Sequence, residues 1–201
     1  KADAVSAWTE ESEGIYKASY TAHLIGDKLT AQLTMPGWQT KHSDAFSIAG
    51  DKDTAKIAAM QITANNAVAR RDHNTVAVTV RDVHQNLLQG QNVTFTVVNG
   101  AAVFADPNGG IVTTDKDGIA SVNLASDQAV NSLIKAEING SSQSVEVSFI
   151  TGDISQLTST IKTDDVSYTA GGKIKVSVTL MDEQKNLVKG MASLLAGSSV
   201  V

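Results

Sequence analysis

The sequence predicts an all-β protein made of tandem β-sandwich domains. Apolar and polar residues alternate in short segments, Asn-Gly and Asp-Gly pairs separate these segments, and a stretch of the chain occurs twice. Successive side chains of a strand point to opposite faces, so alternation indicates a strand with one buried and one solvated face. No segment carries a sustained apolar stripe at helical spacing.

The repeat is clearest between "VTVRDVHQNLLQG", which begins at Val78, and "VTLMDEQKNLVKG", which begins at Val178. Both stretches carry an aspartate, an asparagine and a glycine at the same spacing: Asp82, Asn86 and Gly90 in the first, and Asp182, Asn186 and Gly190 in the second. A period of about 100 residues is too long for a solenoid unit and fits an array of domains.

A second set of similarities links the start of the chain to its middle. "EGIYKASYTA" from Glu13 resembles "DGIASVNLAS" from Asp117, and "FSIAGD" from Phe46 resembles "SFITGD" from Ser148. These similarities predict three units: the C-terminal part of a domain over residues 1–52, a complete domain over 53–152, and the N-terminal part of a third over 153–201. The linker "TGDIS" is short, so neighbouring units should be held close together.

Within the complete unit, alternating segments predict strands at residues 76–80, 93–97, 121–124 and 145–149. Their apolar positions form the candidate core: Val76, Val78, Val80, Val93, Phe95, Val97, Val122, Leu124, Val145, Val147 and Phe149. Turn pairs lie between the strands at Asn99-Gly100, Asn108-Gly109, Asp117-Gly118 and Asn139-Gly140. Such pairs tolerate the positive φ of tight hairpins, and about eight short strands with regular turns indicate a β-sandwich.

These motifs resemble the bacterial immunoglobulin-like domains of the intimin/invasin family of inverse autotransporter adhesins. Asp82, Asn86 and Gly90 fit the Asp-x-x-x-Asn-x-x-x-Gly turn of that family, while Thr114, Asp115 and Gly118 fit its Thr-Asp-x-x-Gly hairpin. The resemblance covers the complete unit and both partial ones. It implies tandem immunoglobulin-like β-sandwiches.

The resemblance also implies a function and a location. Such domains form the stalk or binding region of an adhesin on the bacterial cell surface, attach the cell to a host-cell or matrix protein, and are held by an outer-membrane β-barrel outside this segment. Many relatives end in a lectin-like tip domain, which this segment lacks, so no receptor contact is assigned to a residue here. The first residue is Lys1, not Met, which we interpret as part of a longer protein.

Composition excludes several other classes of function. The formal net charge is −5, whereas a nucleic-acid-binding protein needs a basic face to neutralise phosphates. The absence of cysteine excludes catalytic thiols, thiolate zinc sites and disulfides. No nucleophile elbow, phosphate loop or dinucleotide fingerprint is present. We therefore expect neither an enzyme nor a cofactor, and name no catalytic, cofactor-binding, metal-binding or other binding residue.

Two features could still hold a metal ion. "TDKDG" resembles the start of a calcium loop at Asp115 and Asp117, but the later acidic ligands are missing, so we interpret it as a hairpin turn whose Asp115 accepts from backbone N–H groups. The four histidines, His23, His42, His73 and His84, lie in different segments without metal-site spacing, which favours loop histidines over ligands.

Three functions stay open. The first is the surface adhesin, the second is an accessory module of a secreted enzyme, such as a carbohydrate-binding module, and the third is a spacer without a ligand. A carbohydrate module needs a row of exposed aromatic residues, whereas at least two of Phe95, Phe104 and Phe149 occupy inward positions. Trp8 and Trp38 could anchor a partner, but we expect both to pack within or between domains, with Trp38 the more exposed.

Overall fold

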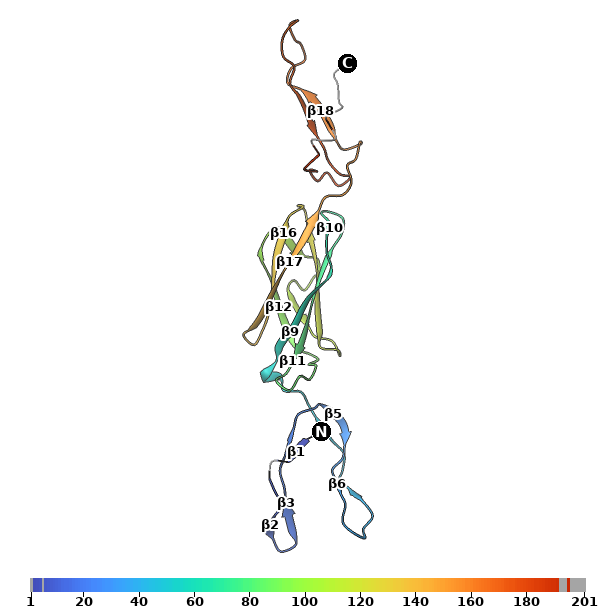
Figure 1. Ribbon diagram of the computed structural model, residues 1–201, viewed down its shortest axis with the longest axis vertical. Helices are drawn as coiled ribbons and strands as arrows, with labels where there is room; N and C mark the ends of the chain where they lie inside the picture. Colours follow the sequence, from blue (N-terminus) through green and yellow to red (C-terminus); the bar gives the residue numbers. More distant parts are fainter. Residues whose placement is uncertain (1, 5, 192–194, 196–201) are drawn as a thin grey trace.

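The structure is a computed structural model that describes residues 2–4, 6–191 and 195. It is an elongated molecule with a central β-sandwich and a smaller segment at each end (Figure 1). The strands β2 and β6 lie at one end of the long axis and β18 lies at the other. Among the described residues, no helix is long and apolar enough to span a bilayer.

Two sheets form the central sandwich. The four-stranded sheet has the order β13-β15-β11-β9, with bounds Ala102–Phe104, Ile119–Ser126, Asn74–Arg81 and Lys56–Ala64. The five-stranded sheet has the order β10-β17-β16-β12-β14, with bounds Ala67–Val68, Ser141–Ile150, Asn131–Ile138, Asn92–Asn99 and Ile111–Thr113. All neighbouring pairs are antiparallel except β10 and β17. The all-β prediction is therefore confirmed.

The core lies between these two sheets and follows the alternation of the sequence. Val76, Val78 and Val80 of β11 are almost completely buried, and β11 pairs with β15 so that Val76 lies opposite Val122 and Val78 opposite Ala120. The predicted inward positions of the other strands are buried or partly buried in the same cluster. The central sandwich has nine strands; β10, with only two residues, is too short to show alternation.

The glycines of all four predicted turn pairs have positive φ, but only the pair Asn139-Gly140 has positive φ at both residues. Asn139 (φ 47°) and Gly140 (φ 76°) connect β16 to β17, and both have positive φ. This is the conformation of the two-residue turns that match the twist of a hairpin. A short 3₁₀ helix, η1 (Lys52–Thr54), leads into β9.

The N-terminal segment consists of two arms, each a long antiparallel hairpin (Figure 1). The first arm pairs β1 with β4 and β2 with β3, with bounds Ala2–Ala4, Tyr20–Ala22, Thr9–Ser12 and Ile15–Lys17. The second arm pairs β5 with β8 and β6 with β7, with bounds Gly26–Leu29, Phe46–Ile48, Gln32–Leu33 and Lys41–His42. At the other end of the molecule, β18 (Thr160–Thr163) pairs with β19 (Val176–Thr179).

Both tryptophans are more exposed than predicted. Trp8 and Trp38 are 60% and 58% exposed, so the expectation that both pack within or between domains is wrong, and Trp38 is not the more exposed of the two. Trp8 lines a cavity of about 650 Å³ whose other lining residues include Leu29 and Phe46 of the second arm. No strand among the described residues fills this cavity, which explains why the side chain of Trp8 stays accessible.

Candidate functional site at the inter-domain joints

The repeated Asp-x-x-x-Asn segment forms the same loop at two places along the long axis. In residues 82–86 the Asp82 N–H donates to the Asn86 carbonyl oxygen at 3.0 Å, and Gln85 has φ 68°. In residues 182–186 the Asp182 N–H donates to the Asn186 carbonyl oxygen, also at 3.0 Å, and Lys185 has φ 63°. We call the contact of residues 82–86 with the N-terminal segment the first joint. The contact of residues 182–186 with the central sandwich is the second joint.

Asp82 is the centre of the first joint. Asp82 is 3% exposed, and its carboxylate accepts four hydrogen bonds. Oδ1 accepts from the backbone N–H groups of His84 and Asn86 at 2.9 and 2.8 Å. Oδ2 accepts from the Asn86 side-chain amide at 2.8 Å and from the Asp51 N–H at 3.2 Å. A carboxylate can be buried without a cation when N–H donors satisfy its oxygens.

Asn86 connects this loop to the N-terminal segment. Its side-chain amide donates to the His23 carbonyl oxygen at 2.8 Å, while its Oδ1 accepts from the Ile25 N–H at 3.2 Å. Both groups of the Asn86 side chain therefore bind backbone atoms on the far side of the joint. These two bonds fix the orientation of the side chain, because its NH₂ group can only donate and its Oδ1 can only accept.

The second joint uses the same chemistry. Asp182 has no exposed surface, and its Oδ2 accepts from the Gly152 N–H at 2.7 Å and from the Asn186 side-chain amide at 2.8 Å. Asn186 also donates to the Ala69 carbonyl oxygen of the central sandwich at 2.9 Å. Arg70 adds a bond to the Gln184 carbonyl oxygen at 3.3 Å.

Burial and hydrogen bonding shift the pKa values of Asp82 and Asp182 in opposite directions. Burial raises the pKa of Asp82, but bonds from the Asn86 side chain and from backbone N–H groups outweigh it and hold this pKa below its usual value. For Asp182, burial again raises the pKa, and bonds from Asn186, Gly152 and Gln184 lower it further than burial raises it. Both carboxylates are therefore ionised near neutral pH and depend on their donors.

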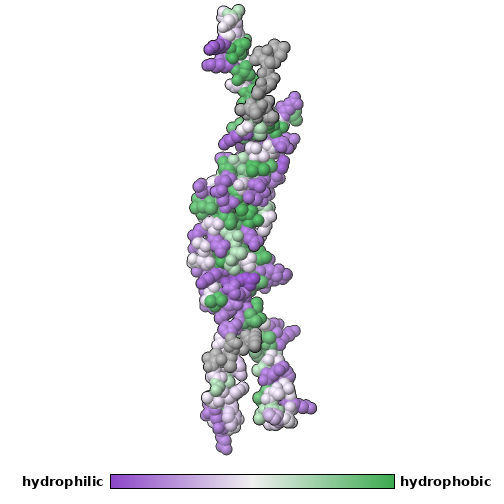
Figure 2. Space-filling view, viewed as in Figure 1, coloured by the Kyte–Doolittle hydropathy of each residue, from purple (hydrophilic) through white to green (hydrophobic). Residues whose placement is uncertain are grey.

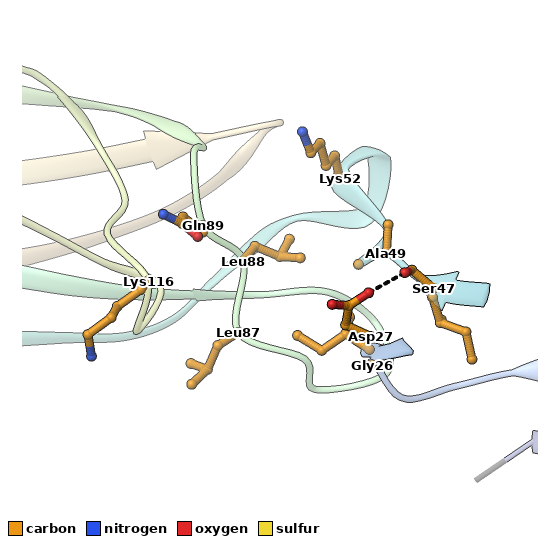
Figure 3. A pocket seen from close by; sticks show the side chains of 12 residues that line it. Gly26, Asp27, Ser47, Ala49, Lys52, Leu87, Leu88, Gln89 and Lys116 are labelled. Carbon is orange, nitrogen blue, oxygen red and sulfur yellow. Dashed lines mark hydrogen bonds between the residues drawn. The ribbon is translucent and has the colours of Figure 1, made fainter. Parts of the chain in front are cut away.

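Close packing accompanies the hydrogen bonds of the first joint. A Cβ built on Gly50 would lie 2.4 Å from Leu88 Cδ2, so the glycine lets the linker approach this buried leucine. Beside this contact is an open cavity of about 530 Å³, lined by both sides of the joint (Figure 3). Asp27 and Ser47 border it and are joined by a 2.5 Å hydrogen bond, while Lys52 and Lys116 lie at its edges.

The structure also shows where the calcium-loop candidate and two of the histidines lie. Asp115 Oδ1 accepts from the N–H groups of Asp117 and Ile119, both at 2.9 Å, which confirms the hairpin-turn interpretation. The structure brings His23 and His84 together across the first joint, with their Nδ1 atoms 3.2 Å apart, a pairing that their separation in sequence did not reveal. Across residues 2–4, 6–191 and 195, no group of three His, Cys, Asp or Glu side chains is arranged to hold a metal ion.

The phenylalanines of the central sandwich lie where alternation predicted. Phe95 and Phe149 are 3% exposed, and Phe104 is partly buried against the same core. These rings are therefore not available as a platform for sugar stacking.

The sequence motif identified the loop but not its role as a joint. Asp82 and Asn86 were interpreted as part of a turn, because a single sequence shows local spacing and not which segment lies opposite. The sequence carried one signal of this role, because the same Asp–Asn pair recurs beside a short linker. Aspartate and asparagine are rarely buried unless their hydrogen bonds are satisfied.

Comparison with known proteins identifies the central sandwich. Residues 57–150 match the family model described as bacterial Ig-like domain (group 1). This part of the chain is a bacterial Ig-like domain.

The similarity extends beyond the bacterial Ig-like domain. The inverse autotransporter adhesin YeeJ of Escherichia coli (strain K12) is 32% identical over 186 residues, which cover 90% of this chain and 8% of that protein. The two proteins are homologous, which confirms the resemblance to inverse autotransporter adhesins. The chain spans less than a tenth of the length of this relative.

One solved structure shows the same fold over most of this chain. The E. coli adhesin FdeC superposes with a TM-score of 0.59 at 20% identity, over 92% of this chain and 60% of that one. Invasin, described as a bacterial integrin-binding protein, superposes with a TM-score of 0.44 at 30% identity, over 61% of this chain and 25% of that one.

Proposed function

We propose that the chain is a stiff segment of the extracellular stalk of an inverse-autotransporter-type adhesin. The observation that carries this proposal is the repetition of one buried Asp–Asn joint at both ends of the bacterial Ig-like domain. A stalk must keep successive domains in line, and each joint binds backbone atoms of the preceding segment through a side chain that is itself held in place. The homology to YeeJ supports the adhesin class over an accessory module of an enzyme.

We propose the three-unit division on the same basis. Residues 1–52 form the C-terminal part of one domain, 53–152 the complete domain, and 153–201 the N-terminal part of a third. The two arms of the N-terminal segment carry the repeats of β15 and of the end of β17, and the C-terminal segment carries the repeat of β11 and its Asp–Asn loop. The joints then recur once per domain.

The location and the partner follow from the adhesin class. The segment stands on the bacterial surface, is held by an outer-membrane β-barrel elsewhere in the parent protein, and positions a region that binds a host-cell or matrix protein. Its role is mechanical, not catalytic. In the view of Figure 2, hydrophilic and hydrophobic residues are intermixed along the rod.

Small-angle X-ray scattering on the purified chain tests the stalk proposal. The wild type should give the scattering of a stiff rod, and a variant with Asn86→Ala and Asn186→Ala should give a more flexible particle of smaller mean radius of gyration. A variant with Asn92→Ala is the control, because Asn92 is exposed and bonds Thr113 within one domain. Equal flexibility in all three proteins would contradict the proposal.

A binding assay separates a stalk from a receptor-binding region. The purified chain is applied to cultured epithelial cells and to immobilised matrix proteins. A stalk segment should show no saturable binding to either surface, whereas saturable binding would place a receptor site within these residues and would overturn the purely mechanical role.

A further inference from the structure

We propose that the edge along which β9 and β10 run beside β17 bears the tension when the central domain is pulled along its long axis. We call this edge, formed by the contacts of residues 57–74 with β17, the seam, and we assign its locking role to Asn65 and Asn74. The inference rests on the proposed stalk function and goes beyond it by naming the part of the domain that resists force. The whole seam lies within residues 57–150, the bacterial Ig-like domain, so it does not depend on the segments at either end.

The neighbouring segments attach to the central domain at opposite ends of its long axis. The start of β9 lies beside the N-terminal segment, and β17 ends beside the C-terminal segment (Figure 1). The joints agree with this placement, because the Asp51 N–H donates to the first joint and the Gly152 N–H donates to the second. A force that separates the two segments therefore pulls β9 and β17 in opposite directions.

The first strands of the domain run parallel to its last strand. Near the start of β17, the Ile57 N–H of β9 donates to Ser141 Oγ, and the Gln143 side-chain amide donates to the Ile57 carbonyl oxygen, both at 3.2 Å. At the other end of β17, its last two residues pair with β10 in parallel. Opposite pulls on the two sides of the seam must therefore slide β17 along its own axis past β9 and β10, which loads all of these bonds together.

Asn74 ties the seam to both sheets. This residue begins β11 of the four-stranded sheet and has no exposed surface. Its Oδ1 accepts from the Ala67 N–H of β10 at 3.0 Å, and its side-chain amide donates to the Ser148 carbonyl oxygen of β17 at 2.9 Å. Because β10 has only two residues, these side-chain bonds make up a large share of its attachment to β17.

Asn65 supplies a second lock at the same place. It lies just after β9, is exposed, and accepts from the Ser148 N–H through its Oδ1 at 2.9 Å. The N–H and the carbonyl oxygen of Ser148 are therefore both bound by asparagine side chains. Beyond β10, the Ala69 N–H adds a bond to the Ile150 carbonyl oxygen at 3.0 Å. β17 cannot slide past β10 until these bonds break.

Single-molecule pulling with optical tweezers attached to the two ends of the chain tests the role of the seam. Unfolding of the central domain is recognised by its gain in length, about 3.3–3.6 Å per residue at full extension. Unfolding under force is governed by the unfolding rate, which rises when bonds that break in the transition state are removed. Asn74→Ala deletes two such bonds of a buried side chain and should unfold at least about tenfold faster at a given force.

Ser132→Ala is the matched control for Asn74→Ala. Ser132 is 1% exposed, and its Oγ accepts from the N–H groups of Ala101 and Ala102 at 3.1 and 3.0 Å, away from the seam. Both variants lose two bonds of a buried polar side chain, so both should be less stable in urea. Only Asn74→Ala should unfold much faster under tension, and equal acceleration by the two substitutions would overturn the proposal.

An exposed pair of asparagines gives a test that does not depend on the folding of Asn74→Ala. Asn65 and Asn92 are both exposed, and each accepts one bond through its Oδ1, from Ser148 on the seam and from Thr113 off it. Asn65→Ala should unfold about two- to tenfold faster at a given force, whereas Asn92→Ala should match the wild type. An Asn65→Ala variant that unfolds at the wild-type rate would overturn the proposal.

The direction of pulling provides the last arm of the experiment. Cysteines introduced at the exposed residues Asp127 and Asp153 attach the tweezers just before β16 and just after β17, at the same end of the domain. Because β16 and β17 pair antiparallel, this pull separates their pairs one after another and should unfold the domain at a lower force than pulling from the chain ends. Equal forces in the two directions would overturn the seam, while the stalk proposal would stand if the scattering still showed a stiff rod.

Discussion

The side-chain amide of Asn186 donates to the carbonyl oxygen of Ala69 at 2.9 Å, although 117 positions separate the two residues in sequence. The same amide also bonds the buried carboxylate of Asp182 at 2.8 Å. Asn86 makes the equivalent pair of bonds with His23 and Asp82 at the first joint. One asparagine therefore couples a buried charge in one segment to the backbone of the segment before it.

Removing the Asn86 side chain should destabilise the first joint. Asn86→Ala deletes one donor to the Asp82 carboxylate and both bonds to the N-terminal segment. A lost hydrogen bond to a buried charge costs about 1.5–3 kcal/mol. We expect a loss of that order in the free energy of unfolding of the central domain, measured by urea denaturation.

The control for this change is Asn92→Ala in the same domain. The Asn92 side chain is exposed and accepts from Thr113 at 2.8 Å, so its removal should cost much less. Equal losses for the two alanine variants would show that Asn86 contributes no more than a surface side chain.

Acid should weaken both joints. The pKa values of Asp82 and Asp182 are lowered in the folded protein, so their stabilisation is fully present above the unfolded pKa of about 3.9. This stabilisation is lost as the pH falls through the lowered pKa values of the folded protein. Protonation removes the negative charge and gives the carboxyl group an O–H donor that faces other N–H donors. The free energy of unfolding should therefore fall between pH 5 and pH 2, within roughly the window expected for such carboxylates.

Asp82→Asn provides the check on this pH dependence. The variant should be less stable at pH 7, because its NH₂ group would face N–H donors, and its stability should change less on acidification. A variant that keeps the full pH dependence of the wild type would show that other carboxylates carry it.

The sequence predicted the sandwich but not the joints, for a physical reason. Alternation at Val76, Val78 and Val80 is a local consequence of burying one strand face, so it can be read without knowing the opposing sheet. Across the joints, Asn86 and Asn186 donate to backbone carbonyl oxygens, which every residue carries, and Asn86 also accepts from a backbone N–H group. No side chain at His23 or Ala69 therefore marks these positions as acceptors.

The tryptophans show a second limit of sequence-based prediction. Trp8 was expected to pack within or between domains, whereas it is 60% exposed and lines the cavity between the arms. Whether such a position is buried depends on the strands that cover it, and here no described strand does.

Gly50 and Gly152 occupy matching positions at the two joints and should respond differently to substitution. The added Cβ of Gly50→Ala would lie 2.4 Å from Leu88 Cδ2, whereas that of Gly152→Ala would lie 3.5 Å from its nearest neighbours, an ordinary contact. Leu88 is 4% exposed and its Cδ2 atom must move aside, and such overpacking costs about 1–3 kcal/mol. Thermal unfolding should show a lower melting temperature for Gly50→Ala, and similar effects of both substitutions would contradict the packing argument.

Calcium should not stabilise the Asp115 hairpin. Asp115 Oδ1 is occupied by two backbone N–H donors, as in a turn that needs no cation. We expect millimolar calcium to leave the melting temperature of the wild type unchanged and Asp115→Ala to lower the free energy of unfolding by about 1 kcal/mol. A calcium-dependent rise in melting temperature that Asp115→Ala abolishes would instead show a metal site at this turn.

The most direct test of the joints is a distance measurement across the second one. Spin labels on cysteines introduced at Lys135 in β16 and Lys162 in β18 report the distance between the central and C-terminal segments by pulsed electron paramagnetic resonance, recorded on labelled chains diluted in unlabelled protein. The account predicts one narrow distance distribution for the wild type and a clearly broader one for Asn186→Ala. A broad wild-type distribution, or a narrow one that Asn186→Ala leaves unchanged, would contradict it.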